Sequence, residues 1–255
     1  MRLHRFYITE KIGSQKELVI DSPELVNQIS RVFRLGAGDK IVVFDGSGSD
    51  FECEIMDDAS FNKTPSIKLG TSRDKSPRGW RQLHLVVCEV RPSRYMPTRK
   101  VVLYQAVVKK DNFEWIVEKA TELGVTDIVP VITERSEKKD LNMERLQKIA
   151  VEASEQCGRG DVPVVHSLRL NLKLISDTSF QMVALHLEGK DFTSLRLNLK
   201  EMGGQSLAVF IGPEGGWSPA ELEMFHTNNI SIYSLGKQVL RAETAAVVAL
   251  SKVLM

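Results

Sequence analysis

The stretch from 206 to 225, SLAVFIGPEGGWSPAELEMF, constrains the fold more than any other part of the chain. It starts with the continuous apolar run 207–211, the pattern of a short strand buried on both faces. Glycines in 212–216 then permit positive φ and let a ligand approach the main chain. Ser218 and Glu221 have the spacing of a capping box that begins a helix. Such a strand-to-helix turn is a usual ligand site in an open α/β sheet, although a tight turn without a ligand fits the same residues.

Composition and charge narrow the classes of partner. Hydrophobic residues make up 42% and charged residues 26% of the 255 residues, which suits a soluble protein of one large or two smaller domains. The 34 Lys and Arg nearly balance the 33 Asp and Glu, so net charge does not indicate a polyanionic partner. Basic residues nevertheless crowd the segment 73–110, which suits either phosphate binding or a solvated linker.

The cysteines and the apolar runs bear on the compartment in which the protein works. Three widely spaced cysteines without a CxxC pair favour a reducing compartment and argue against disulfides and structural zinc. No long apolar run predicts a membrane span, and the start MRLHRFYITE lacks the apolar core of a signal peptide. We therefore expect a cytoplasmic protein that binds neither a membrane nor a metal.

Two regions differ in pattern and predict two domains. Residues 1–72 are expected to form a small β-rich unit, and residues 73–255 an α/β domain that begins with a polar linker at 73–82. The strands predicted in the first unit are 4–9, 17–20, 39–46, 49–57 and 66–70.

One helix interrupts these strands. Ser22 is expected to cap it and Gly36 to end it. The residues predicted for its buried face are Leu25, Ile29, Val32 and Phe33. Arg31 and Arg34 would then point away from that face, as solvated arginines usually do.

The second region alternates helices with short apolar strands, which is the pattern of an α/β fold. The predicted strands are 83–90, 101–108, 126–133, 182–189, 207–211 and 230–236. Four helices are predicted in this region. The first begins at the cap Asp111 and ends at Gly124, and the second has an apolar stripe that starts at Leu146 and ends at Gly158. The third begins at Ser218, and the fourth is the small-residue segment 241–255.

Three strand ends are expected to meet at one edge of the sheet, at 185–189, 212–216 and 235–241. A site made mainly of main chain and small residues suits a flat heterocycle, whose edge hydrogen-bonds to backbone groups. The motifs GxGxxG, GxxxxGK[ST], HExxH and GxSxG do not occur. By elimination, the pocket is predicted to be a nucleoside site that needs neither magnesium nor a covalent nucleophile.

Arg241 and Glu243 follow the third strand end, where the chain enters the last helix. They are either a surface ion pair, which contributes little to stability, or a functional pair. In the functional case the arginine orients an anionic or carbonyl-bearing substrate and the carboxylate accepts a proton.

Several segments together resemble a known enzyme family. They are KKDNFEWIVEKATELGV at 109–125, IGPEGGWSPAE at 211–221, LGKQVLRAETA at 235–245, EASEQCGRGDVP at 152–163 and ISRVFRLGAGD at 29–39. Taken in their order along the chain, they are similar to the small-subunit (16S) ribosomal RNA uridine-N3 methyltransferases of the SPOUT, or α/β-knot, class. The stretch 81–99 looks longer than the usual join between the domains, which leaves open the strand that begins the second one.

This resemblance implies a fold, a cofactor and a reaction. The fold is an N-terminal PUA-like β-barrel followed by an α/β SPOUT domain with a trefoil knot. S-adenosylmethionine is expected in the knot, and a homodimer is expected to build the active site. The implied reaction is methylation of uridine N3 in small-subunit ribosomal RNA. Two alternatives stay open: a SPOUT methyltransferase for another rRNA or tRNA base or ribose, and a non-catalytic RNA-binding assembly protein.

The resemblance also implies site residues in this sequence. Those for the cofactor are Leu185, Gly212, Pro213, Glu214, Gly215, Gly216, Leu235, Gly236, Val239, Leu240, Arg241, Thr244 and Ala245. Those for RNA are Arg5, Arg31, Arg34, Lys110, Arg135 and Arg159. As the catalytic pair, Arg241 is expected to stabilise charge on a uracil carbonyl oxygen, and Glu243, or a water it holds, to take the N3 proton.

Overall fold

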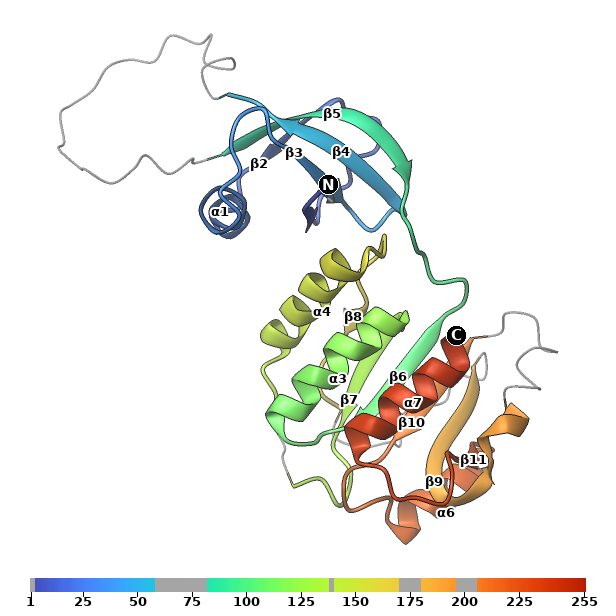
Figure 1. Ribbon diagram of the computed structural model, residues 1–255. Helices are drawn as coiled ribbons and strands as arrows, with labels where there is room; N and C mark the ends of the chain where they lie inside the picture. The colour runs from blue at the N-terminus through green and yellow to red at the C-terminus, as the bar shows by residue number, and fades with distance from the viewer. Residues whose placement is uncertain (1–2, 58–81, 138–139, 170–179, 196–205) are drawn as a thin grey trace. The chain divides into compact units, whose positions relative to one another are not determined.

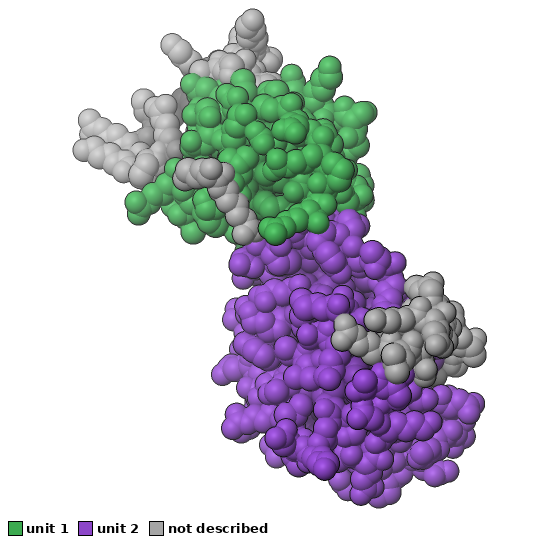
Figure 2. All heavy atoms as spheres, turned by 45° about the vertical axis from the view of Figure 1, so that its right-hand side comes forward, with its two compact units in different colours: residues 1–94 green, residues 95–255 purple. Residues whose placement is uncertain are grey.

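The computed structural model describes residues 3–57, 82–137, 140–169, 180–195 and 206–255. The chain divides into two compact units, Met1–Arg94 and Tyr95–Met255, which Figure 2 distinguishes by colour. They are called here the N-terminal unit and the C-terminal unit. Among the described residues, no helix combines the length and apolar character that crossing a bilayer requires.

The N-terminal unit is a five-stranded sheet in the order β1-β3-β4-β5-β2 (Figure 1). Its strands are β1 (Arg5–Tyr7), β2 (Glu17–Ile20), β3 (Lys40–Phe44), β4 (Ser49–Ile55) and β5 (Leu83–Pro92). β1 pairs with β3 in parallel, and the other neighbours pair antiparallel. Alternate residues of β4 (Phe51, Cys53 and Ile55) are buried in its core, as the period of two predicts. β3 and β4, which fall in the predicted strands 39–46 and 49–57, pair antiparallel.

Strand β5 shows that the predicted domain boundary is wrong. The sequence assigned 83–90 to the α/β domain, but β5 pairs antiparallel with both β4 and β2. Its apolar residues Leu83 and Leu85 are fully buried in the core of the N-terminal unit, which therefore extends to Arg94. The predicted strand 66–70 and residues 73–81 of the predicted linker lie outside the described residues.

The predicted helix of this unit changes its winding part-way along. Helix α1 (Pro23–Asn27) begins at the expected cap Ser22 and continues as the π-helix η1 (Gln28–Val32). A π-turn holds more residues than an α-turn, so the side chains that follow it leave the predicted buried stripe. Val32 is 67% and Phe33 37% exposed, which corrects their assignment to the buried face.

The C-terminal unit contains a six-stranded sheet in the order β11-β9-β10-β6-β7-β8, in which all neighbouring strands pair in parallel. The strands are β6 (Val101–Ala106), β7 (Asp127–Val131), β8 (Val164–Val165), β9 (Gln181–Asp191), β10 (Leu207–Ile211) and β11 (Ser231–Ser234). The helices are α3 (Lys110–Leu123), α4 (Met143–Cys157), α6 (Pro219–Thr227) and α7 (Ala242–Leu254). Apart from 83–90, each predicted strand of this region is confirmed, whereas β8 was not predicted.

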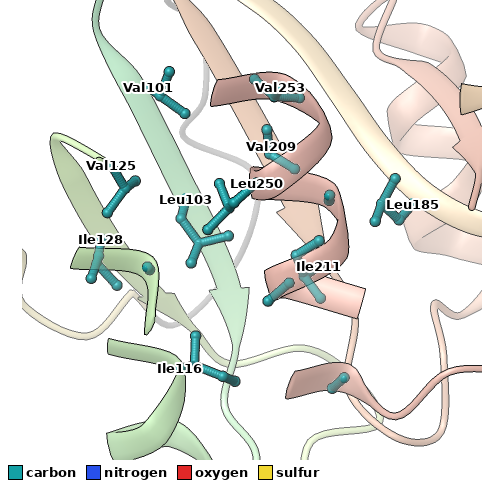
Figure 3. Packing of buried hydrophobic residues seen from close by; sticks show 14 of the residues in the cluster. Val101, Leu103, Ile116, Val125, Ile128, Leu185, Val209, Ile211, Leu250 and Val253 are labelled. Carbon is teal, nitrogen blue, oxygen red and sulfur yellow. The ribbon is translucent and has the colours of Figure 1, made fainter. Parts of the chain in front are cut away.

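Strand β10 lies at the centre of a three-layered arrangement. Leu207, Val209 and Ile211 belong to the core cluster that also holds residues of α3, α4 and α7. Figure 1 shows α3 and α7 across one face of the sheet, and Figure 3 shows side chains of β6, β10 and α7 gathered between them. Ala208 and Phe210 face the opposite cluster, which includes Phe225 of α6. The prediction that this strand is buried on both faces is therefore confirmed.

Candidate active site

A cavity of about 310 Å³ opens at the carboxyl ends of β10 and β11, next to residues 185–187 of β9, which follow the last residue of β9 that pairs with β10. Its volume is at the lower end of the range for small-molecule sites. The lining comes from 185–187, 211–217, 234–236 and 238–240, with additions from α7 and from Arg135. In a parallel sheet the carboxyl ends of neighbouring strands share one edge, and the three predicted strand ends do meet there.

The cavity lining includes every residue of the expected cofactor set except Arg241 and Thr244. Both are exposed at the start of α7, next to the lining residues Leu240, Ala242 and Ala245. The geometry therefore brings the set together at one place, and its role in binding a cofactor stays a prediction.

Glycines are needed in the turn after β10 for two different reasons. The N–H of Gly216 donates to the carbonyl oxygen of Pro213 at 2.9 Å, and Gly216 has a φ of +69°, where a side chain is strained. At Gly212 a Cβ would stand 3.2 Å from Cε2 of the Trp217 indole, so the ring would have to shift. The conformation of this turn therefore favours glycine, which has no side chain, at both Gly212 and Gly216.

Trp217 connects this turn to Leu185 of β9. Its indole is buried, and Nε1–H donates to the carbonyl oxygen of Leu185 at 2.8 Å. The ring also meets Phe225 edge-on at 4.9 Å between centroids. Two walls of the cavity are therefore joined by one side chain, which the sequence reasoning did not single out although it directly follows the glycine-rich turn.

A second brace comes from the loop after β7. Nη1 of Arg135 donates to the carbonyl oxygen of Gly215 at 2.9 Å. The carboxylate of Glu221 accepts from the N–H groups of Glu134 at 3.0 Å and Ser218 at 2.8 Å, which includes the predicted capping box. Arg135, expected at the RNA, therefore lies at the cavity wall.

His186 presents a hydrogen-bond donor to the cavity that it lines. Its Nδ1 accepts from the N–H of Glu188 at 3.2 Å, which in the neutral ring places the proton on Nε2. That N–H suits a carbonyl or carboxylate oxygen of a ligand. Exposed apolar side chains, Leu187 and Val239, also line the cavity. His186 and Leu187 lie in the expected strand end 185–189, but no role was predicted for their side chains, whereas Val239 was in the expected cofactor set.

The expected catalytic pair lies at the N-terminus of α7. Arg241 is the N-cap residue and is exposed, while Glu243 is in the first turn. No ion pair joins the two within the described part of the chain, so the surface-pair interpretation is not supported. Oε2 of Glu243 is buried without a hydrogen-bond partner among the described residues. A buried carboxylate oxygen without a donor is costly, so this atom is suited to a proton or a donor from a ligand.

Two of the six arginines and lysines expected at the RNA are structural. Arg159 is 1% exposed: it forms a bidentate ion pair with Asp161 at 2.7 and 2.9 Å and donates to the carbonyl oxygens of Thr121 and Val125. It thereby satisfies carbonyl groups at the C-terminal end of α3, where a cation is also favoured by the helix dipole. This burial corrects its assignment to RNA.

Arg5 is the second correction. Its side chain is 7% exposed, and Nη2 lies 2.6 Å from Oδ1 of Asp50. The guanidinium also stacks over the ring of Phe44 at 4.4 Å. Of the other expected RNA residues, Arg31 and Arg34 are exposed as predicted, and Lys110 is also exposed, 3.9 Å from the carboxylate of Glu114.

The described residues contain no group of three or more His, Cys, Asp or Glu side chains placed to hold a metal ion.

Comparisons with known proteins agree with this two-unit arrangement. Residues 95–254 match the family model of an RNA methyltransferase domain, and residues 29–59 match that of an RNA methyltransferase PUA domain. The ribosomal RNA small subunit methyltransferase E of Bacillus subtilis is 32% identical over 90% of this chain and 87% of its own. That of Rickettsia conorii is 28% identical over 99% of this chain and 96% of its own.

Solved structures are also similar. A Legionella pneumophila protein in complex with the bound cofactor SAM has a TM-score of 0.80 and 26% identity, covering 98% of this chain and 96% of that one. A ribosomal RNA small subunit methyltransferase E from Neisseria gonorrhoeae, bound to S-adenosyl methionine, has a TM-score of 0.79 over the same shares. At 22% identity the second likeness shows a common fold.

The match of residues 95–254 to an RNA methyltransferase domain, together with the match of residues 29–59 to the PUA domain, shows that this chain is an RNA methyltransferase. Within that class, the chain belongs to the ribosomal RNA small subunit methyltransferase E family. The expected family and the PUA-like nature of the N-terminal unit are thereby confirmed.

Proposed function

We propose that the protein methylates N3 of a uridine in small-subunit ribosomal RNA and takes the methyl group from S-adenosylmethionine. The observation that carries the proposal is the cavity built from three main-chain turns in a chain of this family. Its relative from Legionella pneumophila is solved with bound SAM.

The cavity fits this cofactor at its glycines. Gly216 and Gly236 line it, and at both positions the space where a Cβ would stand is open. A flat base can therefore approach the main chain there, between the turns at 212–216 and 234–240. S-adenosylmethionine supplies a methyl group on a sulfonium, which is already a strong electrophile.

The remaining task of the protein is to make uridine N3 a nucleophile. N3 carries a proton, and its lone pair becomes available only when that proton leaves. Arg241 stabilises the negative charge that develops on a uracil carbonyl oxygen, assisted by the positive end of the α7 dipole. Glu243, whose Oε2 is buried without a donor among the described residues, or a water it holds, takes the proton.

The proposal extends to the assembly and the substrate. It includes a trefoil knot in the C-terminal unit and a homodimer, which the resemblance of the motifs implies, and a cytoplasmic location, which the spacing of the cysteines favours. The target base, in a folded ribosomal RNA, is splayed out of its stack to enter the cavity. The exposed Arg31, Arg34 and Lys110 are the cations for RNA phosphates, and affinity therefore falls as salt rises.

Mass spectrometry of ribosomal RNA from cells lacking the gene tests the reaction. We expect the loss of one N3-methyluridine in small-subunit RNA and its restoration by the purified protein. Loss of a different methylated nucleotide would favour another base or ribose as acceptor. Failure to bind S-adenosylmethionine in calorimetry would favour a non-catalytic assembly protein.

Arg241→Ala tests the catalytic assignment. We expect the rate of methyl transfer to fall about 100-fold or more, whereas the Kd for S-adenosylmethionine changes little, because the charge is stabilised in the transition state. Lys237→Ala is the matched control, since Lys237 is an exposed cation in the same loop and outside the cavity lining. Equal losses of rate and of cofactor affinity in Arg241→Ala would make this arginine a binding or folding residue instead.

A further inference from the structure

An exposed pair of aromatic rings lies on the N-terminal unit. The rings of His4 and Phe33 have centroids 4.4 Å apart at an interplanar angle of 49°. Phe33 also meets the fully buried Phe6 edge-on at 5.4 Å, which anchors it on the core. His4 is exposed and Phe33 is 37% exposed, so this pair, called here the His4–Phe33 platform, presents ring surface to the outside.

The local winding of the chain keeps these apolar groups at the surface. The π-helix η1 ends at Val32, which is 67% exposed, directly before Phe33. π-helical turns are rare and occur frequently at functional sites. The pattern of apolar residues predicts that Val32 and Phe33 are buried. Their exposure is therefore a result of the π-helical turn.

Two cations flank the platform along the chain. Arg31 and Arg34 are exposed, and neither side chain has a hydrogen bond or an ion pair with another described residue. Arg34 has a φ of +57°, a left-handed conformation that is uncommon for a residue other than glycine. Such strain concentrates at functional sites. By contrast, Arg5, the neighbour of His4, is neutralised by Asp50.

We propose that the His4–Phe33 platform binds an unpaired nucleotide of the RNA substrate, with Arg31 and Arg34 at its neighbouring phosphates. This inference rests on the proposed function in taking RNA as the substrate. Paired bases hide their faces in the helix stack, so exposed rings recognise bases that are splayed out or single-stranded. Aromatic stacking accepts any base, and arginines supply the charge that the sugar-phosphate backbone requires.

The charge pattern favours RNA over a protein partner for this surface. An acidic peptide would satisfy Arg31 and Arg34 but would leave the ring faces of His4 and Phe33 unused. A nucleotide satisfies both, because it joins an aromatic base to an anion within one unit. The surface therefore adds base stacking to the phosphate contacts expected from the arginines alone.

The test compares Phe33→Leu with the wild-type full-length chain in binding a single-stranded RNA that contains 2-aminopurine and no uridine. We expect the affinity of Phe33→Leu to fall about tenfold, and the quenching of 2-aminopurine fluorescence to disappear, because the stacking ring is lost. Phe33→Tyr keeps the ring and is expected to bind like the wild type. Affinity for a fully paired RNA duplex is expected to stay unchanged in both variants.

Val19→Ala is the control for removing apolar surface, since Val19 is a 55% exposed residue of the same unit without a ring. It is expected to leave RNA affinity unchanged. A thermal melt and S-adenosylmethionine binding, which uses the other unit, check that Phe33→Leu is folded. The proposal is overturned if folded Phe33→Leu binds the single strand as tightly as the wild type, or if it loses affinity for the duplex equally.

The outcomes separate this inference from the proposed function. Because the probe lacks uridine, stacking at the platform is measured without any methyl transfer. Stacking that depends on Phe33, in a protein that leaves uridine N3 unmethylated, would support the platform and overturn the reaction. Normal methylation at N3 together with Phe33-independent binding would support the reaction and overturn the platform.

Discussion

The two units build their functional surfaces in opposite ways. The cavity of the C-terminal unit is formed largely by main chain and glycines, so its shape depends on positions that carry no side chain. The platform of the N-terminal unit is formed by exposed rings and arginines over a closed apolar core. Adding atoms should therefore damage the first surface, whereas removing atoms should damage the second.

The largest expected effect compares one arginine from each unit. Arg159→Ala should lower the free energy of unfolding by about 3 kcal/mol, because it leaves Asp161 unpaired and the carbonyl groups of Thr121 and Val125 without their donor. Arg31→Ala should change it by less than about 0.5 kcal/mol, as is usual for an exposed residue. Urea unfolding of both variants measures the difference. Similar losses in the two variants would show that Arg31 has a structural partner or that Arg159 is dispensable.

The second comparison adds one methyl group to a glycine in each unit. At Gly189 of β9 a Cβ would lie 2.4 to 2.7 Å from main-chain atoms of Tyr233 in β11, so the two strands must separate. Gly189→Ala should therefore cost about 2 kcal/mol of unfolding free energy. Gly36→Ala in the N-terminal unit is the control, since a Cβ there meets nothing within 4 Å. Equal melting temperatures for the two variants would contradict the close approach of β9 and β11.

The sequence was sufficient where the determinants of structure are local. The stretch 206–225 holds a buried apolar run, a glycine-rich turn and a capping box, so the strand, the turn and the helix were all predicted. The convergence of three strand ends also followed, because parallel strands present their carboxyl ends at one edge. The lining residues were then obtained from the family resemblance.

The failures lie where partners are distant in sequence. β5 has apolar residues that suit either unit, and its pairing with β4 and β2 decides between them. Likewise, the sequence around Arg159 does not indicate that this arginine is buried, because its partners Thr121 and Val125 are more than 30 residues away in the chain. The failure at Phe33 is of another kind, because its exposure depends on a local π-turn, for which the helical pattern of apolar residues gives no signal.

A smaller effect is expected from the contact between Gly212 and Trp217 at the cavity wall. Gly212→Ala should weaken S-adenosylmethionine binding about tenfold, because the indole must move away from a new Cβ at 3.2 Å. Trp217→Phe removes the donor to the carbonyl oxygen of Leu185 and should cost about 1 to 2 kcal/mol of stability.

The double variant sharpens this prediction. A smaller ring at 217 leaves room for the methyl group of Gly212→Ala. The loss of cofactor affinity in the double variant should therefore be smaller than the sum of the losses in the two single variants. Calorimetric titration of all three variants gives the coupling, with Gly36→Ala as a control that should bind the cofactor normally. Strict additivity would mean that Trp217 does not shape the wall at Gly212.

The smallest effect probes how well the core of the N-terminal unit is closed. Burial, with smaller contributions from the charges of Cys88 and Glu52, raises the pKa of Cys53 from 9.0 to about 12. The folded chain therefore keeps the thiol proton that the unfolded chain loses above pH 9, and stability falls as pH rises from about 9 toward 12. At pH 10 the expected loss is about 1 kcal/mol. Urea unfolding at pH 8 and 10 should show a steeper decline in the wild type than in Cys53→Ala, which lacks the thiol. Parallel declines would mean that water reaches Cys53 and that this core is open.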